Sequence, residues 1–92
     1  AFGTHASKLA ISATKSQTGH LLGGAGSVEF VFLVQALLDQ RVPPTLHWER
    51  RDPSCDLDYV PGHEPRAWEI GHAMSLSFGF GGPIGALVAS RC

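Results

Sequence analysis

"SVEFVFLVQALLDQRVPP", residues 27–44, is the stretch that decides the fold. Only Glu29 and Gln35 interrupt the apolar run from Val28 to Leu38, so apolar side chains cover nearly the whole circumference of a helix. A helix that is hydrophobic all round is buried on all sides. We predict a helix that begins around Gly19–His20 and ends near Gln40, before a proline pair. The rest of a 92-residue chain offers too few layers to bury it, so it is expected to be the central helix of a larger protein or to pack against another chain.

The segments on either side of the helix predict an α/β fold. "LAISA", residues 9–13, is short, apolar and β-branched, as in a buried strand. "AMSLSFGF", residues 73–80, and "IGALVAS", residues 84–90, predict two further strands, and their short connection implies that they are antiparallel. The segment 41–69 holds most of the prolines and both tryptophans and is expected to be irregular.

Composition excludes several classes of function. The net charge is −1, and no basic run is longer than Arg50–Arg51, so nucleic-acid binding is not expected. Cys55 and Cys92 have neither metal-ligand nor disulfide-framework spacing, so we expect no metal site, and the pattern is consistent with a reducing compartment.

The remaining composition signals concern processing and membranes. Residues 1–10 lack the pattern of a signal peptide, and no initiator Met is present, so the chain is expected to begin inside a longer reading frame or to be processed. Residues 21–38 are long enough to span a membrane, but glycines and polar residues interrupt them and we expect no span.

"TKSQTGH", residues 14–20, joins the first predicted strand to the helix and has two interpretations. A histidine at the first turn of a helix sits near converging backbone N–H groups, which favours a neutral ring that donates one N–H to a developing negative charge. Lys15 is then the nearest candidate partner for Glu29, the only acid in the body of the helix. The alternative is a polar capping turn with His20 and Lys15 in solvent.

The glycine-rich segments also have two interpretations. The spacing of the four glycines in 19–26 fits neither nucleotide-binding motif, and small residues there favour close packing of another backbone. In "SFGFGGP", residues 77–83, alternating Phe and Gly at a strand end exposes main-chain N–H groups, two of which aimed at one point form an oxyanion hole. The alternative is an ordinary glycine-rich hairpin.

Taken together, three segments carry a resemblance. "TKSQTGHLLGGAGSVE" (14–29), "VPPTLHWERRDPSCDLDYVP" (42–61) and "SFGFGG" (77–82) resemble the C-terminal part of a β-ketoacyl-acyl-carrier-protein synthase, an elongating condensing enzyme of the thiolase superfamily. The likeness runs in order over nearly the whole chain. It implies that residues 1–92 form part of the C-terminal domain, in a thiolase fold with a mixed sheet and a buried central helix. It also implies that the N-terminal half, with the nucleophilic cysteine and the first histidine, is absent.

The resemblance also implies roles for individual residues. His20 matches the second active-site histidine, which donates a hydrogen bond to the malonyl thioester carbonyl. Lys15 matches the lysine of the same motif, and Glu29 matches its partner. Phe80 matches the aromatic residue whose backbone N–H contributes to the oxyanion hole and whose ring gates the acyl pocket. The glycines Gly79, Gly81 and Gly82 would give that loop its freedom.

The implied reaction is decarboxylative Claisen condensation in fatty-acid or polyketide synthesis. It uses substrates held as phosphopantetheine thioesters on a carrier protein or coenzyme A, and it needs no bound cofactor. The implied partners are acyl carrier protein, the N-terminal half and a second copy of the enzyme in a homodimer. The implied location is the cytoplasm, or an organelle in a eukaryote, and the 92 residues alone are expected to be inactive.

Two residues after the last of these motifs, Pro83 and Ile84, leave other functions open. The family usually follows "GFGG" with Thr-Asn, whereas Pro83 and Ile84 stand here; Pro83 removes a backbone donor and Ile84 removes polar contacts. One alternative is therefore a non-catalytic partner subunit resembling the chain-length factor of polyketide synthases, which acts by binding. The other is an unrelated small binding module with glycine-rich turns.

Overall fold

Two strands at the end of the chain form an antiparallel hairpin in the computed structural model, which describes residues 1–92. β3 (His72–Phe78) pairs with β4 (Ile84–Ser90) in a register that places Phe78 opposite Ile84 and His72 opposite Ser90. The two predicted strands and their antiparallel pairing are thereby confirmed. The earlier elements are η1 (Gly3–Lys8), α1 (Lys15–Thr18), η2 (Leu22–Gly24), α2 (Ala25–Asp39), β1 (Arg41–Val42) and β2 (Arg66–Ala67).

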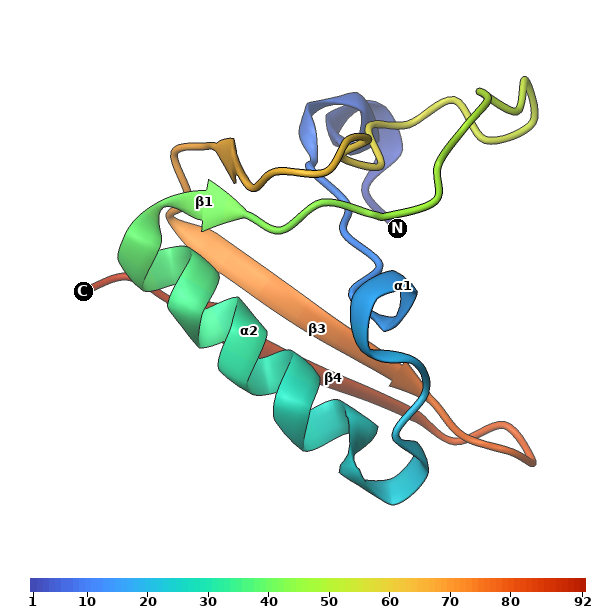
Figure 1. Cartoon of the computed structure of the whole chain (residues 1–92). Coiled ribbons are helices and arrows are strands. Elements are labelled where there is room, and N and C mark those ends of the chain that lie inside the picture. Colours follow the sequence, from blue (N-terminus) through green and yellow to red (C-terminus); the bar gives the residue numbers. More distant parts are fainter. The chain divides into compact units, whose positions relative to one another are not determined.

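The chain divides into two compact units. Unit 1 comprises Ala1–Gly19 and Val42–Arg66, and unit 2 comprises His20–Arg41 and Ala67–Cys92. Unit 2 contains the long helix α2, which packs against β3 and β4 (Figure 1). Ala25, Leu33, Leu37 and Ile70 are its buried apolar residues.

Helix α2 begins five residues later than the sequence predicts. Positive φ angles at Gly19 (74°) and Leu22 (51°) interrupt helical geometry, because L residues rarely adopt that region and a helix cannot continue through it. The short turns α1 and η2 therefore precede α2 as separate pieces. The predicted end is confirmed within a residue, since Gln40 caps the helix in the left-handed conformation.

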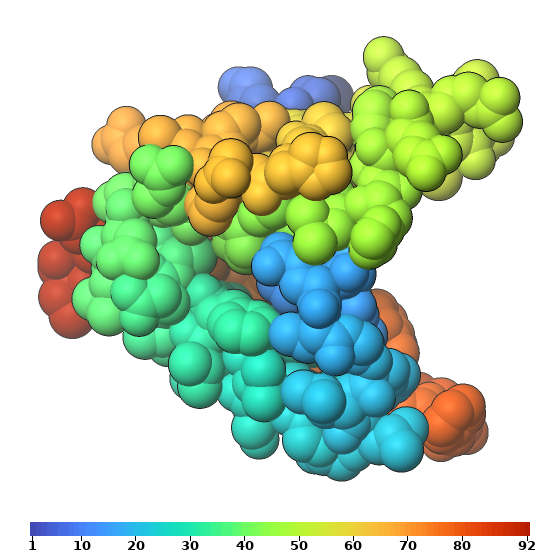
Figure 2. Space-filling view, in the orientation of Figure 1, coloured from blue at the N-terminus to red at the C-terminus, as the bar shows by residue number.

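Burial of α2 is one-sided in this chain. The buried Leu33 and Leu37 belong to the side packed on the hairpin, whereas Val31 and Leu38 are 63% and 71% exposed. Figure 2 shows side chains of α2, teal to green, at the surface. By length and composition alone, Leu22–Asp39 could cross a membrane, a property that core helices of soluble proteins share, so this is weak evidence for a span.

The helix covers the face of the hairpin on which β3 carries small side chains. A carbon added at Gly26, in the first turn of α2, would lie 3.4 Å from Ser77 Oγ, so Ser77 faces the helix. Side chains alternate along a strand, so Ala73 and Ser75 share that face, and both are half-buried. The opposite face is apolar and exposed, and it carries Met74, Leu76, Phe78, Ile84, Ala86 and Val88.

Gln40 ties the end of α2 to the segment that enters β3. Its side-chain amide Nε2 donates to the carbonyls of Leu37 (2.8 Å) and Ile70 (3.0 Å), and Oε1 accepts the N–H of Ile70 at 2.8 Å. Its backbone carbonyl accepts the N–H of Trp68 at 3.0 Å. These bonds explain why glutamine occupies a left-handed cap where glycine is more usual.

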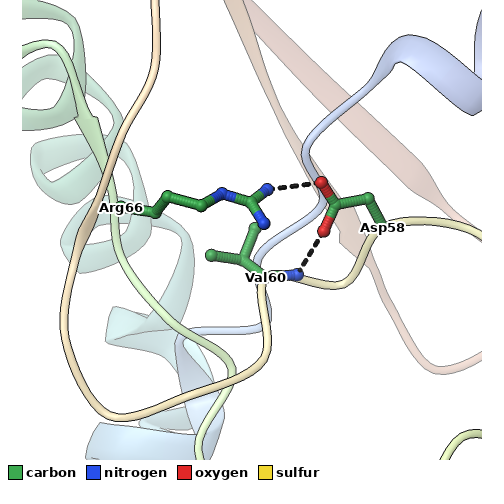
Figure 3. A network of polar contacts seen from close by, with 3 residues as sticks. All are labelled: Asp58, Val60 and Arg66. Carbon is green, nitrogen blue, oxygen red and sulfur yellow. Dashed lines mark hydrogen bonds and ion pairs between the residues drawn. The ribbon is translucent and has the colours of Figure 1, made fainter.

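Unit 1 is irregular, as the sequence predicts for most of its length. Asp58 accepts hydrogen bonds from the Val60 N–H (3.0 Å) and from the Arg66 guanidinium, as Figure 3 shows, and Val60 is fully buried. The strand predicted over residues 9–13 is wrong: only Ala10 forms a bridge, with Asp58, and the segment is at most half-buried. A strand needs a continuous ladder of partners, and the chain supplies one short contact.

Candidate functional site

His20 lies in the loop that leads from α1 into η2. It is exposed, and it is not in the first turn of a helix, so the expectation that a helix dipole acts on it is wrong. A different interaction orients its ring, since Nδ1 accepts the backbone N–H of Leu22 at 3.0 Å. A backbone N–H can only donate, so Nδ1 carries the lone pair and the proton of the neutral ring is on Nε2. The neutral His20 ring therefore has its N–H donor at Nε2, and its role as a donor in catalysis stays a prediction.

Leu22 is the residue that sequence reasoning missed. The backbone at Leu21, with φ −84° and ψ 14°, turns the chain so that the Leu22 N–H points back toward His20 Nδ1. A hydrogen bond from a main-chain group depends on the local backbone path and not on a side-chain type. The sequence carries no signal for this contact beyond the polar, glycine-containing character of the turn.

Lys15 is the first residue of α1 and is exposed. Its neighbours hold the turn within unit 1. Ser16 Oγ donates to the Ala13 carbonyl (2.7 Å) and accepts the Leu46 N–H (2.8 Å), and Gln17 Nε2 donates to the Pro44 carbonyl at 2.7 Å. The Ser-Gln pair within "TKSQTGH" therefore positions the backbone that carries Lys15.

Glu29 lies in the second turn of α2 and is half-buried. It belongs to unit 2, whereas Lys15 belongs to unit 1. Their pairing stays a prediction.

Phe80 stands in the turn between β3 and β4, and its side chain is 98% exposed. The turn is closed by hydrogen bonds from Gly79 N to Pro83 O (2.8 Å) and from Gly82 N to Gly79 O (3.2 Å). The Phe80 N–H takes part in neither bond. Gly81 and Gly82 have φ angles of 86° and 100°, which explains their residue type.

The structure brings the start of α2 and the β3–β4 turn to the same end of unit 2. The contact between Gly26 and Ser77 joins the first turn of α2 to the last residues of β3, and Figure 1 shows both at that end. The contact is with a side-chain oxygen, and carbons added at Gly19, Gly23 or Gly24 would meet nothing within 4 Å, so the close backbone packing predicted for these glycines is not seen in this chain. The segment with His20 and the turn with Phe80 thus flank one helix–strand contact.

A family model described as "Beta-ketoacyl synthase, C-terminal domain" matches residues 1–49. The chain belongs to the β-ketoacyl synthase family. The match includes the whole of the first segment that carries the resemblance, residues 14–29, and the start of the second, residues 42–49.

Named relatives agree with the β-ketoacyl synthase assignment. The chain is 56% identical to 3-oxoacyl-[acyl-carrier-protein] synthase 2 of Coxiella burnetii over 90 residues, which cover 98% of this chain and 22% of that protein. It is 56% identical to the enzyme of the same name from a Synechocystis species over 82 residues, 89% of this chain and 20% of that protein. The chain therefore spans about a fifth of the length of the curated relatives it matches.

A solved structure shares the β-ketoacyl synthase fold. It is a type II PKS acyl-carrier protein in complex with its ketosynthase bound to the hexaketide, and one of its chains matches with a TM-score of 0.93 and 36% identity. The match covers 99% of this chain and 22% of that one. The expected thiolase fold is confirmed at the level of the overall fold.

Proposed function

We propose that the protein, at its native length, is a 3-oxoacyl-[acyl-carrier-protein] synthase, an acyltransferase. It would receive an acyl group on a cysteine, decarboxylate a malonyl thioester and join the two. In the decarboxylation the electron pair of the bond to the carboxylate becomes the enolate, and CO₂ leaves. The enolate carbon then attacks the acyl thioester carbonyl and displaces the cysteine thiolate. Substrates are thioesters of phosphopantetheine on a carrier protein or coenzyme A, and no bound cofactor takes part.

The orientation of His20 is the observation that carries this proposal. Its Nδ1 is engaged by the Leu22 N–H, so Nε2–H is the ring's free donor on an exposed side chain. Decarboxylation concentrates negative charge on the thioester oxygen of the malonyl group. A donor already oriented before that charge develops stabilises the enolate more than the ground-state carbonyl, and this difference is catalysis.

The β3–β4 turn supplies the second group of the proposed site. We assign the Phe80 N–H to an oxyanion hole for the acyl thioester, because the hydrogen bonds that close the turn leave it unused. The exposed Phe80 ring is the proposed gate of the acyl pocket. The glycines Gly79, Gly81 and Gly82 support this turn.

Lys15 and Glu29 are proposed as an electrostatic pair that supports the site. A lysine charge near the enolate favours the decarboxylation step, and a half-buried carboxylate on α2 holds that charge in place. The pair supports the site and exchanges no proton in the reaction.

The environment of the chain in the whole enzyme is part of the same proposal. We propose that α2 is a central helix, that its exposed Val31 and Leu38 are covered by the N-terminal half or by a second copy in a homodimer, and that β3 and β4 extend into a mixed sheet. The acyl carrier protein is the proposed partner, and the cytoplasm, or an organelle in a eukaryote, is the proposed location.

Substitution of His20 tests the function. In the protein at its native length, His20→Ala is expected to lower kcat for malonyl decarboxylation and condensation by about 10²–10³, as for loss of one oxyanion donor. His5→Ala is the matched control, because His5 is an exposed histidine in η1 outside the proposed site. Full decarboxylation by His20→Ala would overturn the proposal. Absence of condensation by the unsubstituted protein, with malonyl and acyl carrier protein both bound, would favour the chain-length-factor alternative.

A further inference from the structure

The turn from Gly79 to Pro83 is closed at its base by its first and last residues. The Gly79 N–H donates to the Pro83 carbonyl at 2.8 Å, and the Gly82 N–H donates back to the Gly79 carbonyl at 3.2 Å. The three residues between them are held over this base, and Phe80 is one of them. These two bonds therefore hold the ends of the short segment that carries the Phe80 backbone.

Pro83 also closes the turn through its ring. A side-chain carbon added at Gly79 would lie 2.8 Å from Pro83 Cγ, closer than carbons approach in proteins. The pyrrolidine ring thus occupies the space beside Gly79 that a side chain would need. The ring also restricts φ of Pro83 to about −65°, which removes a rotation that other residues have.

This restraint acts against the freedom of the neighbouring glycines. Gly81 and Gly82 hold φ angles of 86° and 100°, and glycine moves readily among such conformations. Without Pro83 the turn would combine flexible glycines with a fully exposed aromatic ring, 98% exposed at Phe80. Pro83 reduces the freedom of this turn, because its own φ is fixed and its ring fills the space beside Gly79.

We propose that Pro83 is a positioning residue that restrains the Gly79–Pro83 turn and so limits how far the backbone of Phe80 can move, which narrows the range of acyl chain lengths that the enzyme accepts. This inference rests on the proposed function, in which the Phe80 ring borders the acyl chain. The Phe80 ring can still rotate about its side-chain bonds, but a restrained turn allows it a shorter displacement than a mobile turn would. An acyl chain that needs a larger displacement is then accepted less well.

Substitution of Pro83 tests the proposal with two measurements on the protein at its native length. The first is amide hydrogen exchange over residues 79–82, which requires no catalytic activity. We expect Pro83→Ala to accelerate exchange at Gly79 and Gly82 by about 10-fold or more, because their hydrogen bonds then open more often. Pro53→Ala, in the exposed loop of unit 1, is the matched control and is expected to leave this exchange unchanged.

The second measurement is kcat/KM for a series of saturated acyl thioesters from four to sixteen carbons. We expect Pro83→Ala to raise kcat/KM for the chain lengths that the natural protein uses least, by about 5-fold or more relative to its preferred length. KM for the malonyl substrate is expected to stay unchanged, since the substitution leaves His20 and Lys15 intact. A merely structural weakening would instead lower kcat/KM uniformly across the series.

A second pair of variants checks the contact itself. Gly79→Ala is expected to accelerate exchange in the turn, because the added methyl collides with the Pro83 ring. The double variant Gly79→Ala/Pro83→Ala is expected to exchange no faster than Pro83→Ala alone, because the collision is then absent. Additive acceleration would show that the two residues do not restrain each other.

The outcomes separate this inference from the proposed function. Unchanged exchange in Pro83→Ala overturns the inference whether or not the protein is active. Faster exchange with an unaltered chain-length profile also overturns it, because the restrained turn then does not select substrates. If the unsubstituted protein catalyses no condensation, the proposed function is overturned, and so is the role of Pro83 in selecting acyl chain lengths. The exchange measurement still decides whether Pro83 restrains the turn.

Discussion

Gly26 in the first turn of α2 lies directly against Ser77 of β3, so closely that an added carbon at Gly26 would be 3.4 Å from Ser77 Oγ. This contact joins the segment that carries His20 to the turn that carries Phe80. The separation of helix and strand at this point therefore sets the geometry of the proposed site.

Substitutions at Gly26 should reveal how tight this contact is. We expect Gly26→Ala to be nearly neutral, because 3.4 Å is an ordinary contact distance and alanine favours helix. Gly26→Leu is expected to lower the free energy of unfolding by about 1–3 kcal/mol through overpacking, and to lower activity with it. Denaturant unfolding and the condensation assay measure the two effects. Equal stability of the Ala and Leu variants would show that the contact is loose.

The side-chain hydrogen bonds of Gln40 are expected to stabilise the fold by more than its left-handed backbone conformation destabilises it. Gln40→Gly relieves the left-handed φ of 53° but removes hydrogen bonds to Leu37 and Ile70. We expect both Gln40→Gly and Gln40→Ala to lower the free energy of unfolding, by about 1–3 kcal/mol, because partly buried backbone groups lose their partners. Thermal unfolding of the two variants measures this. A more stable glycine variant would mean that backbone strain outweighs the side-chain bonds.

The ionised carboxylate of Asp58 is expected to stabilise the fold, so the free energy of unfolding should fall when acid protonates it. The hydrogen bond from Arg66 is the main cause that lowers the pKa of Asp58 below its usual value, and the Val60 N–H and the Arg66 charge act in the same direction against burial. A lowered pKa in the folded state stabilises the fold above the unfolded pKa of about 4, and that stabilisation is lost as pH falls through the folded value.

The comparison variant is Asp58→Asn, which keeps the shape of the side chain. We expect the difference in the free energy of unfolding between the natural protein and Asp58→Asn to be greatest above pH 5 and to shrink as pH falls below 4. Urea unfolding at a series of pH values measures it. A difference that is constant from pH 7 to pH 3 would show that the charge of Asp58 does not contribute.

Charge reversal should decide whether Lys15 and Glu29 act as a pair. Lys15→Glu and Glu29→Lys are each expected to lower kcat for malonyl decarboxylation by about 10-fold or more, because each gives the two members of the proposed pair the same charge. The double reversal is expected to recover part of the loss, and its coupling energy in a double-mutant cycle measures the interaction. Additive losses would indicate that the two residues act separately.

A polar substitution at Leu38 should show whether this face of α2 is covered in the protein at its native length. It is 71% exposed in this chain, and a polar substitution at a truly exposed site changes stability by less than about 0.5 kcal/mol. If α2 is a central helix, Leu38→Glu at native length buries a charge and is expected to cost several kcal/mol. Thermal unfolding of Leu38→Glu distinguishes a covered Leu38 from an exposed one. A neutral Leu38→Glu would mean that this face of α2 stays in solvent.

The sequence predicted the elements whose signals are local. The apolar run from Val28 to Leu38 predicted α2, and two apolar segments with a short glycine-rich connection predicted the β3–β4 hairpin. The same reasoning placed the helix start too early, because positive φ angles at Gly19 and Leu22 follow from the path of the chain and not from residue type. It also predicted a strand at residues 9–13, where apolar composition exists without a ladder of partners.

By itself, the sequence determined which residues are candidates for chemistry, since the motif with Lys15 and His20 and the turn with Phe80 are written in residue types at fixed spacing. It also determined membership of the β-ketoacyl synthase family. Only the tertiary structure decided how two of these groups are presented. The Leu22 N–H sets the tautomer of His20, and the mutual fit of Gly79 and Pro83 holds the turn of Phe80. Both depend on the directions of the main chain within a few residues, which no single residue type encodes and which only the folded structure shows.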